Sequence, residues 1–226
     1  MPTPPTQSLT LVVPDVGNVS ALLMTPQAAT ACYVFAHGAG AGMAHSFMAA
    51  FAGELAQRGM ATLRYQFPFM QSGSKRPDSP AVAQATVRAA VVEARRRLPG
   101  LPLFAGGKSF GGRMTSQAQA ASPLEGVRGL VFVGFPLHPA GKPGTERASH
   151  LAQVQCPMLF LQGSRDALAD LGLLRGALEP LGDRTTLSVF DDADHAFHVR
   201  ARSGTTDAAT LTALADAVAE WVASLN

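Results

Sequence analysis

Short hydrophobic runs alternate along the chain with longer segments in which hydrophobic residues recur at helical spacing. Runs of about five to eight residues bounded by turn-forming residues are typical of buried strands, and the longer amphipathic segments are typical of helices. The predicted strands span 9–13, 20–24, 31–38, 61–67, 101–107, 129–135, 157–163 and 185–190. The predicted helices span 46–58, 81–98, 110–121 and 205–225, with a short helix between residues 136 and 156 and a polar loop over 68–80.

This alternation predicts an α/β fold: a mostly parallel sheet flanked by helices on both faces. Strands 9–13 and 20–24 flank a turn rich in Pro, Asp, Gly and Asn, so we expect them to pair antiparallel. No repeat or linker divides the sequence, and a single domain is expected over residues 1–226. Only about 20 residues join strands 129–135 and 157–163, which predicts an open site with minimal or no lid.

Composition argues against several classes of protein. The formal net charge of +2 is too small for a nucleic-acid-binding surface, and the run Arg95–Arg97 complements the dipole of the helix that it ends. Two cysteines, Cys32 and Cys156, make neither a disulfide framework nor a metal site, and they favour a reducing compartment. With no signal-peptide pattern and no run long enough to cross a bilayer, we predict a cytoplasmic protein without membrane, metal or cofactor binding.

The segment 106–112, GGKSFGG, allows two interpretations, of which a phosphate-binding loop is one. That loop requires G-x-x-x-x-G-K-[ST], so that successive backbone N–H groups wrap around phosphates. Counting back from Gly107 puts Pro102, inside a predicted strand, where the first glycine is required. The neighbouring strand ends in Phe135 instead of a Mg²⁺-binding Asp. The nucleotide-binding interpretation is therefore the weaker one.

The second interpretation is a nucleophile elbow, G-x-S-x-G, between strand 101–107 and the following helix. It puts Ser109 at the apex of a sharp turn, while Gly107 and Gly111 leave room where strand and helix approach closely. The N–H of Phe110 would then face a developing oxyanion. The competing structural explanation is a glycine-rich turn whose serine caps the helix.

A serine nucleophile requires a base, and the base requires an orienting carboxylate. Asp166 and His195 each follow a predicted strand, in the chain order Ser, Asp, His that α/β-hydrolases use. Asp170 and Asp194 compete with Asp166, but Asp170 is expected on a helix and Asp194 adjoins the histidine. His198 is the second choice of base because it lies further from the strand end.

The loop 37–40, HGAG, follows a predicted strand where this fold has its second oxyanion donor. We predict that the N–H of Ala39 acts together with that of Phe110, each contributing about 3 kcal/mol. His37 is expected to hold this loop by hydrogen bonds within it.

Other residues near the elbow have open roles. Lys108 is not expected to be catalytic: it either pairs with an acid or packs its stem while the ammonium reaches solvent. Arg64 and Arg113 could bind an acidic substrate group, although structural ion pairs are the favoured explanation. Residues after strand ends could line a pocket or fill the core, namely Phe67, Phe69, Met70 and 135–138.

Five segments carry a resemblance to a known family: HGAGAG (37–42), LRYQFPFM (63–70), GGKSFGGRM (106–114), LQGSRD (161–166) and DADHAF (192–197). The chain resembles the α/β-hydrolase superfamily, and more narrowly a group of small lidless bacterial hydrolases described as dienelactone-hydrolase-like. The resemblance implies Ser109 as nucleophile, Asp166 as carboxylate and His195 as base. True dienelactone hydrolases use a cysteine nucleophile, so the resemblance says little about the substrate.

Together these observations predict a serine hydrolase that cleaves a carboxylic ester or thioester of a small-molecule acyl substrate through an acyl-enzyme intermediate. One alternative is a non-catalytic binding or scaffold protein that keeps a vestigial site. The other is a peptidase or acyltransferase on the same fold.

Overall fold

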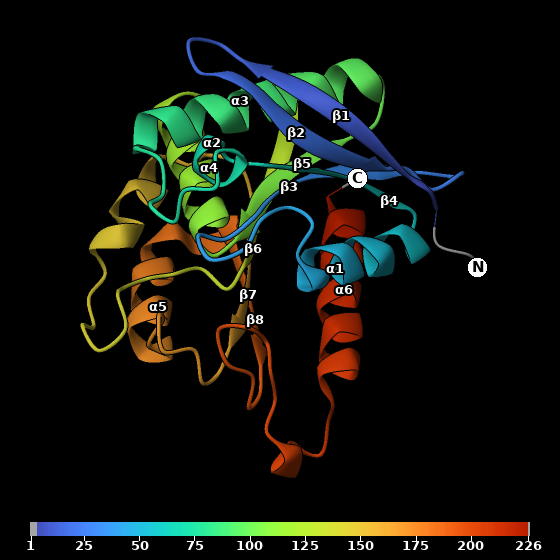
Figure 1. Ribbon diagram of the computed structural model, residues 1–226. Coiled ribbons are helices and arrows are strands. Elements are labelled where there is room, and N and C mark those ends of the chain that lie inside the picture. The colour runs from blue at the N-terminus through green and yellow to red at the C-terminus, as the bar shows by residue number, and fades with distance from the viewer. Residues whose placement is uncertain (1–3, 226) are drawn as a thin grey trace.

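The computed structural model describes residues 4–225, which form an eight-stranded sheet in the order β1-β2-β4-β3-β5-β6-β7-β8 (Figure 1). Strand β2 runs antiparallel to both of its neighbours, and every other neighbouring pair is parallel. The strands are β1 (Thr6–Val13), β2 (Gly17–Met24), β3 (Ala31–Ala36), β4 (Met60–Tyr65), β5 (Leu103–Lys108), β6 (Val127–Val133), β7 (Met158–Gly163) and β8 (Thr185–Phe190). The predicted mostly parallel sheet is confirmed.

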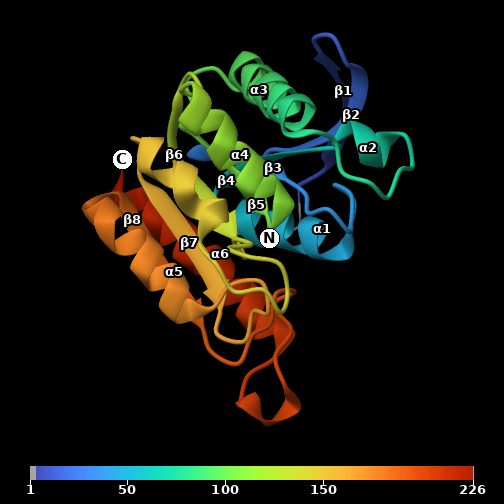
Figure 2. The same cartoon turned by 90° about the vertical axis from the view of Figure 1, so that its left-hand side faces the viewer.

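Helices cover both faces of the sheet, as predicted. Helices α1 and α6 lie on one face, and α3, α4 and α5 lie on the other, which faces the viewer in Figure 2. The helices are α1 (Ser46–Gln57), α2 (Pro68–Gln71), α3 (Pro80–Arg97), α4 (Phe110–Ala121), α5 (Leu171–Leu178) and α6 (Asp207–Ser224). Shorter 3-10 segments are η1 (Glu146–Gln153), η2 (Glu179–Arg184) and η3 (Ala201–Ser203).

The burial of each strand explains its sequence pattern. Strands β3, β4 and β7 are buried along their whole length, because parallel strands in the middle of such a sheet are covered on both faces. Their sequences are accordingly apolar without alternation. Strand β1 at the sheet edge instead alternates buried and exposed positions over its second half, since only one face is covered.

Two layers of side chains form the core, one on each face of the sheet. The largest buried side chains toward α1 and α6 are Tyr33, Phe35, Phe51 and Phe104, with Trp221 packed edge-on against Phe104. Those on the opposite face are Tyr65, Phe67, Phe132, Phe135 and Phe160.

The structure departs from the sequence prediction at the ends of several strands and in one loop. Strands β4 and β6, like β3, end two residues earlier than predicted. Strand β3 ends at Ala36, two residues earlier than predicted, because His37 and Gly38 already belong to the loop at the sheet edge. The predicted polar loop 68–80 begins with the single turn α2, which has Pro68 in its first turn, where a missing N–H costs nothing. Within residues 4–225, no helix combines the length and hydrophobicity required to cross a bilayer.

Candidate active site

Ser109 lies at the apex of a sharp turn between β5 and α4. Its φ of 50° and ψ of −116° are sparsely populated for a residue with a side chain, which marks local backbone strain. Strand β5 continues through Gly107 to Lys108, so no loop precedes the Gly-Lys-Ser sequence and the phosphate-loop interpretation is wrong. Ser109 is the N-cap residue of α4, but its side chain makes no capping hydrogen bond, so the helix-cap explanation is also wrong.

The glycines of the elbow are required by close packing against the end of β3. A Cβ atom on Gly107 would lie 2.5 Å from the carbonyl oxygen of Ala36. One on Gly111 would lie 2.6 Å from both the Ala36 Cβ and the His37 carbonyl oxygen. Both distances are far below van der Waals contact, so the strand and the helix can approach this closely only without side chains at these positions.

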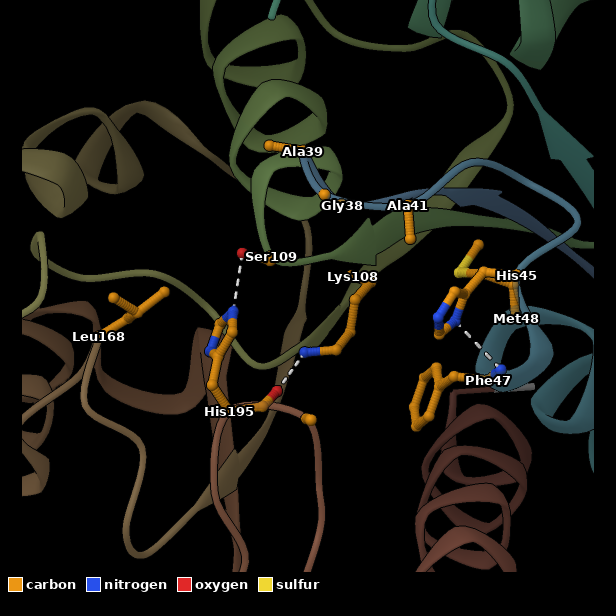
Figure 3. A pocket seen from close by; sticks show the side chains of 12 residues that line it. Gly38, Ala39, Ala41, His45, Phe47, Met48, Lys108, Ser109, Leu168 and His195 are labelled. Atoms are coloured by element: carbon orange, nitrogen blue, oxygen red, sulfur yellow. Dashed lines mark hydrogen bonds between the residues drawn. The ribbon is translucent and has the colours of Figure 1, made fainter. Parts of the chain in front are cut away.

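The structure brings together Ser109, His195 and Asp166, which follow β5, β8 and β7 respectively. His195 Nε2 lies 2.8 Å from Ser109 Oγ (Figure 3), and His195 Nδ1 lies 2.6 Å from Asp166 Oδ2. A neutral imidazole with its proton on Nδ1 satisfies both contacts: it donates to the carboxylate and accepts from the serine hydroxyl. The carboxylate is buried, whereas the histidine side chain is 27% exposed and can meet a ligand.

Three groups hold the buried carboxylate of Asp166. Besides His195, the backbone N–H of Leu168 donates to Oδ1 over 2.8 Å, and the Gln162 amide donates to Oδ2 over 2.5 Å. The other amide atom of Gln162, Oε1, accepts from the N–H of Phe135 over 3.0 Å, which fixes the orientation of the amide. Sequence reasoning missed Gln162, although it lies within LQGSRD, because a glutamine inside a buried strand gave no indication of its partner.

The competing acids and the second histidine lie elsewhere. Asp170 is the N-cap residue of α5, just outside the helix on which it was predicted, and its carboxylate accepts from the N–H of Leu173. Asp194 closes the turn of the His195 loop by accepting from the N–H of His198 over 3.0 Å. The exposed imidazole of His198 pairs with Asp207 over 2.8 Å.

A second serine–histidine pair connects α4 and η1. Ser116 Oγ lies 2.7 Å from His150 Nε2, but the serine is completely buried and also donates to the carbonyl oxygen of Arg113. Burial, followed by the nearby positive charge of Arg113, lowers the pKa of His150 to about 4. Since no acid orients this imidazole among the contacts of residues 4–225 and no substrate could reach the hydroxyl, this pair is a packing contact.

The loop after β3 lies directly beside the elbow. A Cβ atom on Gly38 would lie 3.6 Å from the Lys108 carbonyl oxygen and 3.7 Å from Ser109 Cβ, so little space separates this loop from the elbow. His37 holds this loop as predicted: its Nδ1 lies 2.7 Å from the carbonyl oxygen of Gly38, and its Nε2 accepts from the N–H of Phe67 over 3.0 Å. Burial lowers the pKa of His37, which favours the neutral ring that these two contacts require.

The segment RYQF (64–67) clamps the far end of the same loop. Gln66 Oε1 accepts from the N–H of Met43 over 2.9 Å, and the guanidinium of Arg64 donates to the Met43 carbonyl over 3.2 Å. The Gln66 side chain fills the space beside Gly42, where a Cβ atom would lie 2.8 Å from Oε1. The favoured ion-pair explanation for Arg64 is wrong, because its described hydrogen-bond acceptor is a backbone carbonyl and burial lowers its pKa.

Ser109 and His195 open onto a cavity of about 470 Å³ between the loop after β3, the start of α1 and the His195 loop (Figure 3). Ala39 lines it, and the Phe110 N–H follows the serine at the start of α4, where helix N–H groups lack intrahelical partners. The walls are mostly apolar or small. The lining residues are Gly38, Ala39, Gly40, Ala41, His45, Phe47, Met48, Lys108, Ser109, Leu168, His195 and Ala196.

The aromatic residues that follow β4 and β6 do not line this cavity. Phe67 and Phe135 are completely buried or nearly so, and Phe69 is 3% exposed. The Phe67 and Phe69 rings pack edge-on against Phe110, and this packing supports the residue that follows Ser109. Of the two explanations left open for these residues, core packing is the correct one, and the start of α1 supplies the cavity wall instead.

The basic residues near the elbow do not form the expected contacts. Lys108 neither pairs with an acid nor turns to solvent: it is half-buried in the cavity wall, and its ammonium donates to the backbone carbonyl of His195. Arg113 is half-buried and has no ion pair within residues 4–225, and the charge of Arg147 adds to burial in lowering its pKa. Across the same residues, no group of His, Cys, Asp and Glu side chains has the arrangement of a metal site.

Comparison with known proteins agrees with this fold. A family model described as an alpha/beta hydrolase domain matches residues 29–223. The chain belongs to this family. The α/β-hydrolase described here is also similar to an α/β serine hydrolase without a lid from Xanthomonas campestris, with 25% identity over 98% of this chain and 96% of that one, and a TM-score of 0.75.

Two further solved structures have the same fold. The dienelactone hydrolase from Anabaena variabilis shares 24% identity over 99% of both chains, with a TM-score of 0.76. A serine hydrolase homologue from Coxiella burnetii shares 18% identity over 96% of this chain and 97% of that one, also with a TM-score of 0.76. The predicted resemblance to lidless, dienelactone-hydrolase-like α/β-hydrolases is confirmed.

Proposed function

We propose that this α/β-hydrolase is a serine hydrolase that cleaves a carboxylic ester or thioester through an acyl-enzyme intermediate. The observation that carries the proposal is the hydrogen-bonded chain from Ser109 through His195 to Asp166 at the wall of an open cavity. The likeness to a lidless serine hydrolase from Xanthomonas campestris supports the same reaction class.

In the first half of the reaction, Ser109 Oγ attacks the acyl carbon while His195 Nε2 accepts the hydroxyl proton. Asp166 keeps the Nδ1 proton directed away from the serine and stabilises the imidazolium that forms. The N–H groups of Phe110 and Ala39 bind the oxyanion, each contributing about 3 kcal/mol of transition-state stabilisation. Collapse of the tetrahedral intermediate breaks the carbon–oxygen or carbon–sulfur bond, and the imidazolium returns the proton to the leaving group.

In the second half, a water molecule attacks the acyl-enzyme carbonyl and gives a proton to His195. The same two N–H groups bind the second oxyanion. When this intermediate collapses, the carbon–oxygen bond to Ser109 breaks and the serine regains its proton from the imidazolium. The products are a free acid and the original enzyme, so the cycle requires neither a metal nor a cofactor.

The cavity walls favour a small acyl group with an apolar body. Phe47, Met48 and Leu168 supply the large apolar lining, and glycine and alanine residues supply much of the rest. His45 and Lys108 add polar groups beside Ser109 and His195. A volume of about 470 Å³ suits a small-molecule substrate better than a polypeptide. A peptidase or an acyltransferase on this fold would use the same residues, and a scaffold protein would not need the Ser109–His195 contact.

A fluorophosphonate probe tests the proposal directly, because it reacts only with an activated serine. We expect labelling at Ser109, loss of labelling in Ser109→Ala and His195→Ala, and unchanged labelling in Ser116→Ala, whose histidine partner lacks a carboxylate. A screen of short p-nitrophenyl esters and acyl thioesters should show hydrolysis that the same two substitutions abolish. Folded protein that is neither labelled nor active would instead support the scaffold alternative.

A further inference from the structure

Lys108 connects the strand of the nucleophile to the loop of the base. It is the last residue of β5, immediately before Ser109, and its ammonium donates to the backbone carbonyl oxygen of His195 (Figure 3). The contact joins residues 87 positions apart in the sequence. The neighbour of the proposed nucleophile Ser109 therefore holds the main chain of the proposed base His195.

Aromatic rings enclose the ammonium. Its Nζ lies 5.2 Å from the ring centroid of Phe197 and 5.9 Å from that of Phe47, which are distances at which a cation is attracted to an aromatic face. The two rings stack on each other, with centroids 6.1 Å apart. Phe47 lies in the first turn of α1 and Phe197 belongs to the His195 loop, so the ammonium also holds this loop against the helix.

The ammonium and the His195 imidazole meet beside Gly134, directly after β6. A Cβ atom on Gly134 would lie 3.1 Å from Lys108 Nζ and 3.5 Å from His195 Nδ1 and Cε1. A side chain at this position would therefore displace one of the two groups. Gly134 also has a φ of 69°, a conformation that favours glycine.

The charged and titratable groups around Lys108 come from three loops. Asp166 follows β7, Asp194 and His195 follow β8, and His45 precedes α1 on the same cavity wall. Burial lowers the pKa of Lys108 to about 8, and the attraction of Asp166 and Asp194 opposes this effect. The ammonium is therefore charged at neutral pH and loses its charge as the pH rises through about 8.

We propose that Lys108 is a positioning residue, whose ammonium anchors the backbone of His195 so that the imidazole spans Ser109 and Asp166. This inference rests on the proposed serine hydrolase function. The hydrogen bonds that the loop makes within itself, such as Asp194 N–H to the His198 carbonyl, shape the loop without attaching it to the elbow. Lys108 supplies that attachment, and a neutral amine would supply a weaker one, because charge-assisted hydrogen bonds are the stronger kind.

The test compares Lys108→Met, Lys108→Gln and Lys108→Arg with a matched surface control, Lys142→Met, all checked for folding by thermal melting. On p-nitrophenyl butyrate, we expect Lys108→Met to lower kcat about tenfold to hundredfold with KM within about twofold, the size of loss that a small displacement of reacting groups causes. Lys108→Arg should recover most of the activity and Lys108→Gln part of it. The wild-type kcat should fall above about pH 8, and this fall should be absent from Lys108→Met.

The outcomes separate this inference from the proposed function. The positioning role is overturned if folded Lys108→Met or Lys108→Gln has the same kcat as the wild type. It is also overturned if the kcat of Lys108→Met falls above about pH 8 as that of the wild type does. An increase in KM confined to an anionic ester such as mono-p-nitrophenyl glutarate overturns it as well, because Lys108 would then bind substrate. If the wild-type protein is not labelled by the fluorophosphonate, Ser109 is not an activated nucleophile. That result overturns the proposed serine hydrolase function and the positioning role together. Rapid wild-type labelling with slowed labelling of Lys108→Met supports both.

Discussion

The side-chain amide of Gln162 donates to the same carboxylate oxygen of Asp166 that accepts from His195, with 2.5 Å between Nε2 and Oδ2. Replacing Gln162 with Leu removes this donor and leaves the Phe135 N–H without its acceptor. Because the carboxylate then loses one of the donors that orient it toward His195, we expect kcat to fall about tenfold or more while Ser109 is still labelled. Steady-state kinetics on an ester substrate would measure the change. Gln155→Leu, at an exposed position, is the control, and equal activity of the two variants would contradict the expectation.

Asp166 and Asp170 can be separated by a pair of isosteric substitutions. Asp166→Asn should lower kcat by about 10⁴-fold, because the amide no longer stabilises the imidazolium or selects the Nδ1 tautomer. Asp170→Asn should leave kcat within about twofold, since this residue caps α5 and asparagine is also a good cap. The two kcat values decide the assignment, and the reverse order would make Asp170 the functional carboxylate.

The elbow glycines should tolerate no side chain. In Gly111→Ala, the new Cβ would lie 2.6 Å from Ala36 Cβ, so the strand and the helix must separate. We expect a loss of about 1–3 kcal/mol in the free energy of unfolding, as other overpacked sites show. The matched control is Gly176→Ala in α5, where nothing lies within 4 Å of the added atom. Alanine should stabilise that helix by up to about 1 kcal/mol. Urea unfolding of both variants tests the contrast, which equal midpoints would contradict.

His150 should make stability depend on pH. Burial and the charge of Arg113 lower its pKa to about 4 in the folded protein, below the ordinary histidine value of 6.5. The unfolded chain therefore binds more protons than the folded one between these values, so stability falls as the pH is lowered from about 6.5 to 4. His150→Asn should show a smaller loss of urea midpoint between pH 7 and pH 5 than the wild type. Other titratable groups, such as His37, are common to both proteins, so their contributions cancel in the comparison. An identical loss of urea midpoint in the two proteins would contradict the assignment of this pH dependence to His150.

Much of the fold could be predicted from the local pattern of hydrophobic and polar residues. The buried runs of β3, β4 and β7 and the amphipathic helices between them required only burial and periodicity. Ser109, Asp166 and His195 could be predicted to meet, because each follows a parallel strand and the carboxyl ends of parallel strands share one edge of the sheet.

Hydrogen-bond partners that depend on tertiary packing could not be predicted from local sequence patterns. The acceptor of Lys108 is a backbone carbonyl 87 residues away, and no residue type in the sequence marks a carbonyl as an acceptor. Arg64 likewise donates to the Met43 carbonyl, where an acidic partner was expected. Whether the residues after β4 and β6 line a pocket or fill the core was left open by the sequence. Phe47 and Met48 of α1 line the cavity instead, and their position depends on how that helix crosses the sheet.

The order of the strands has a consequence for how this protein is made. Ser109 follows β5, whereas the proposed base follows β8, which comes later in the sequence than every other strand of this sheet and lies at its far edge. A growing chain displays its serine long before residue 195 is synthesised, and the imidazole arrives only after β8 docks on β7. The proposed activity would therefore require β8, and a chain that lacked this strand would keep Ser109 without its proposed base.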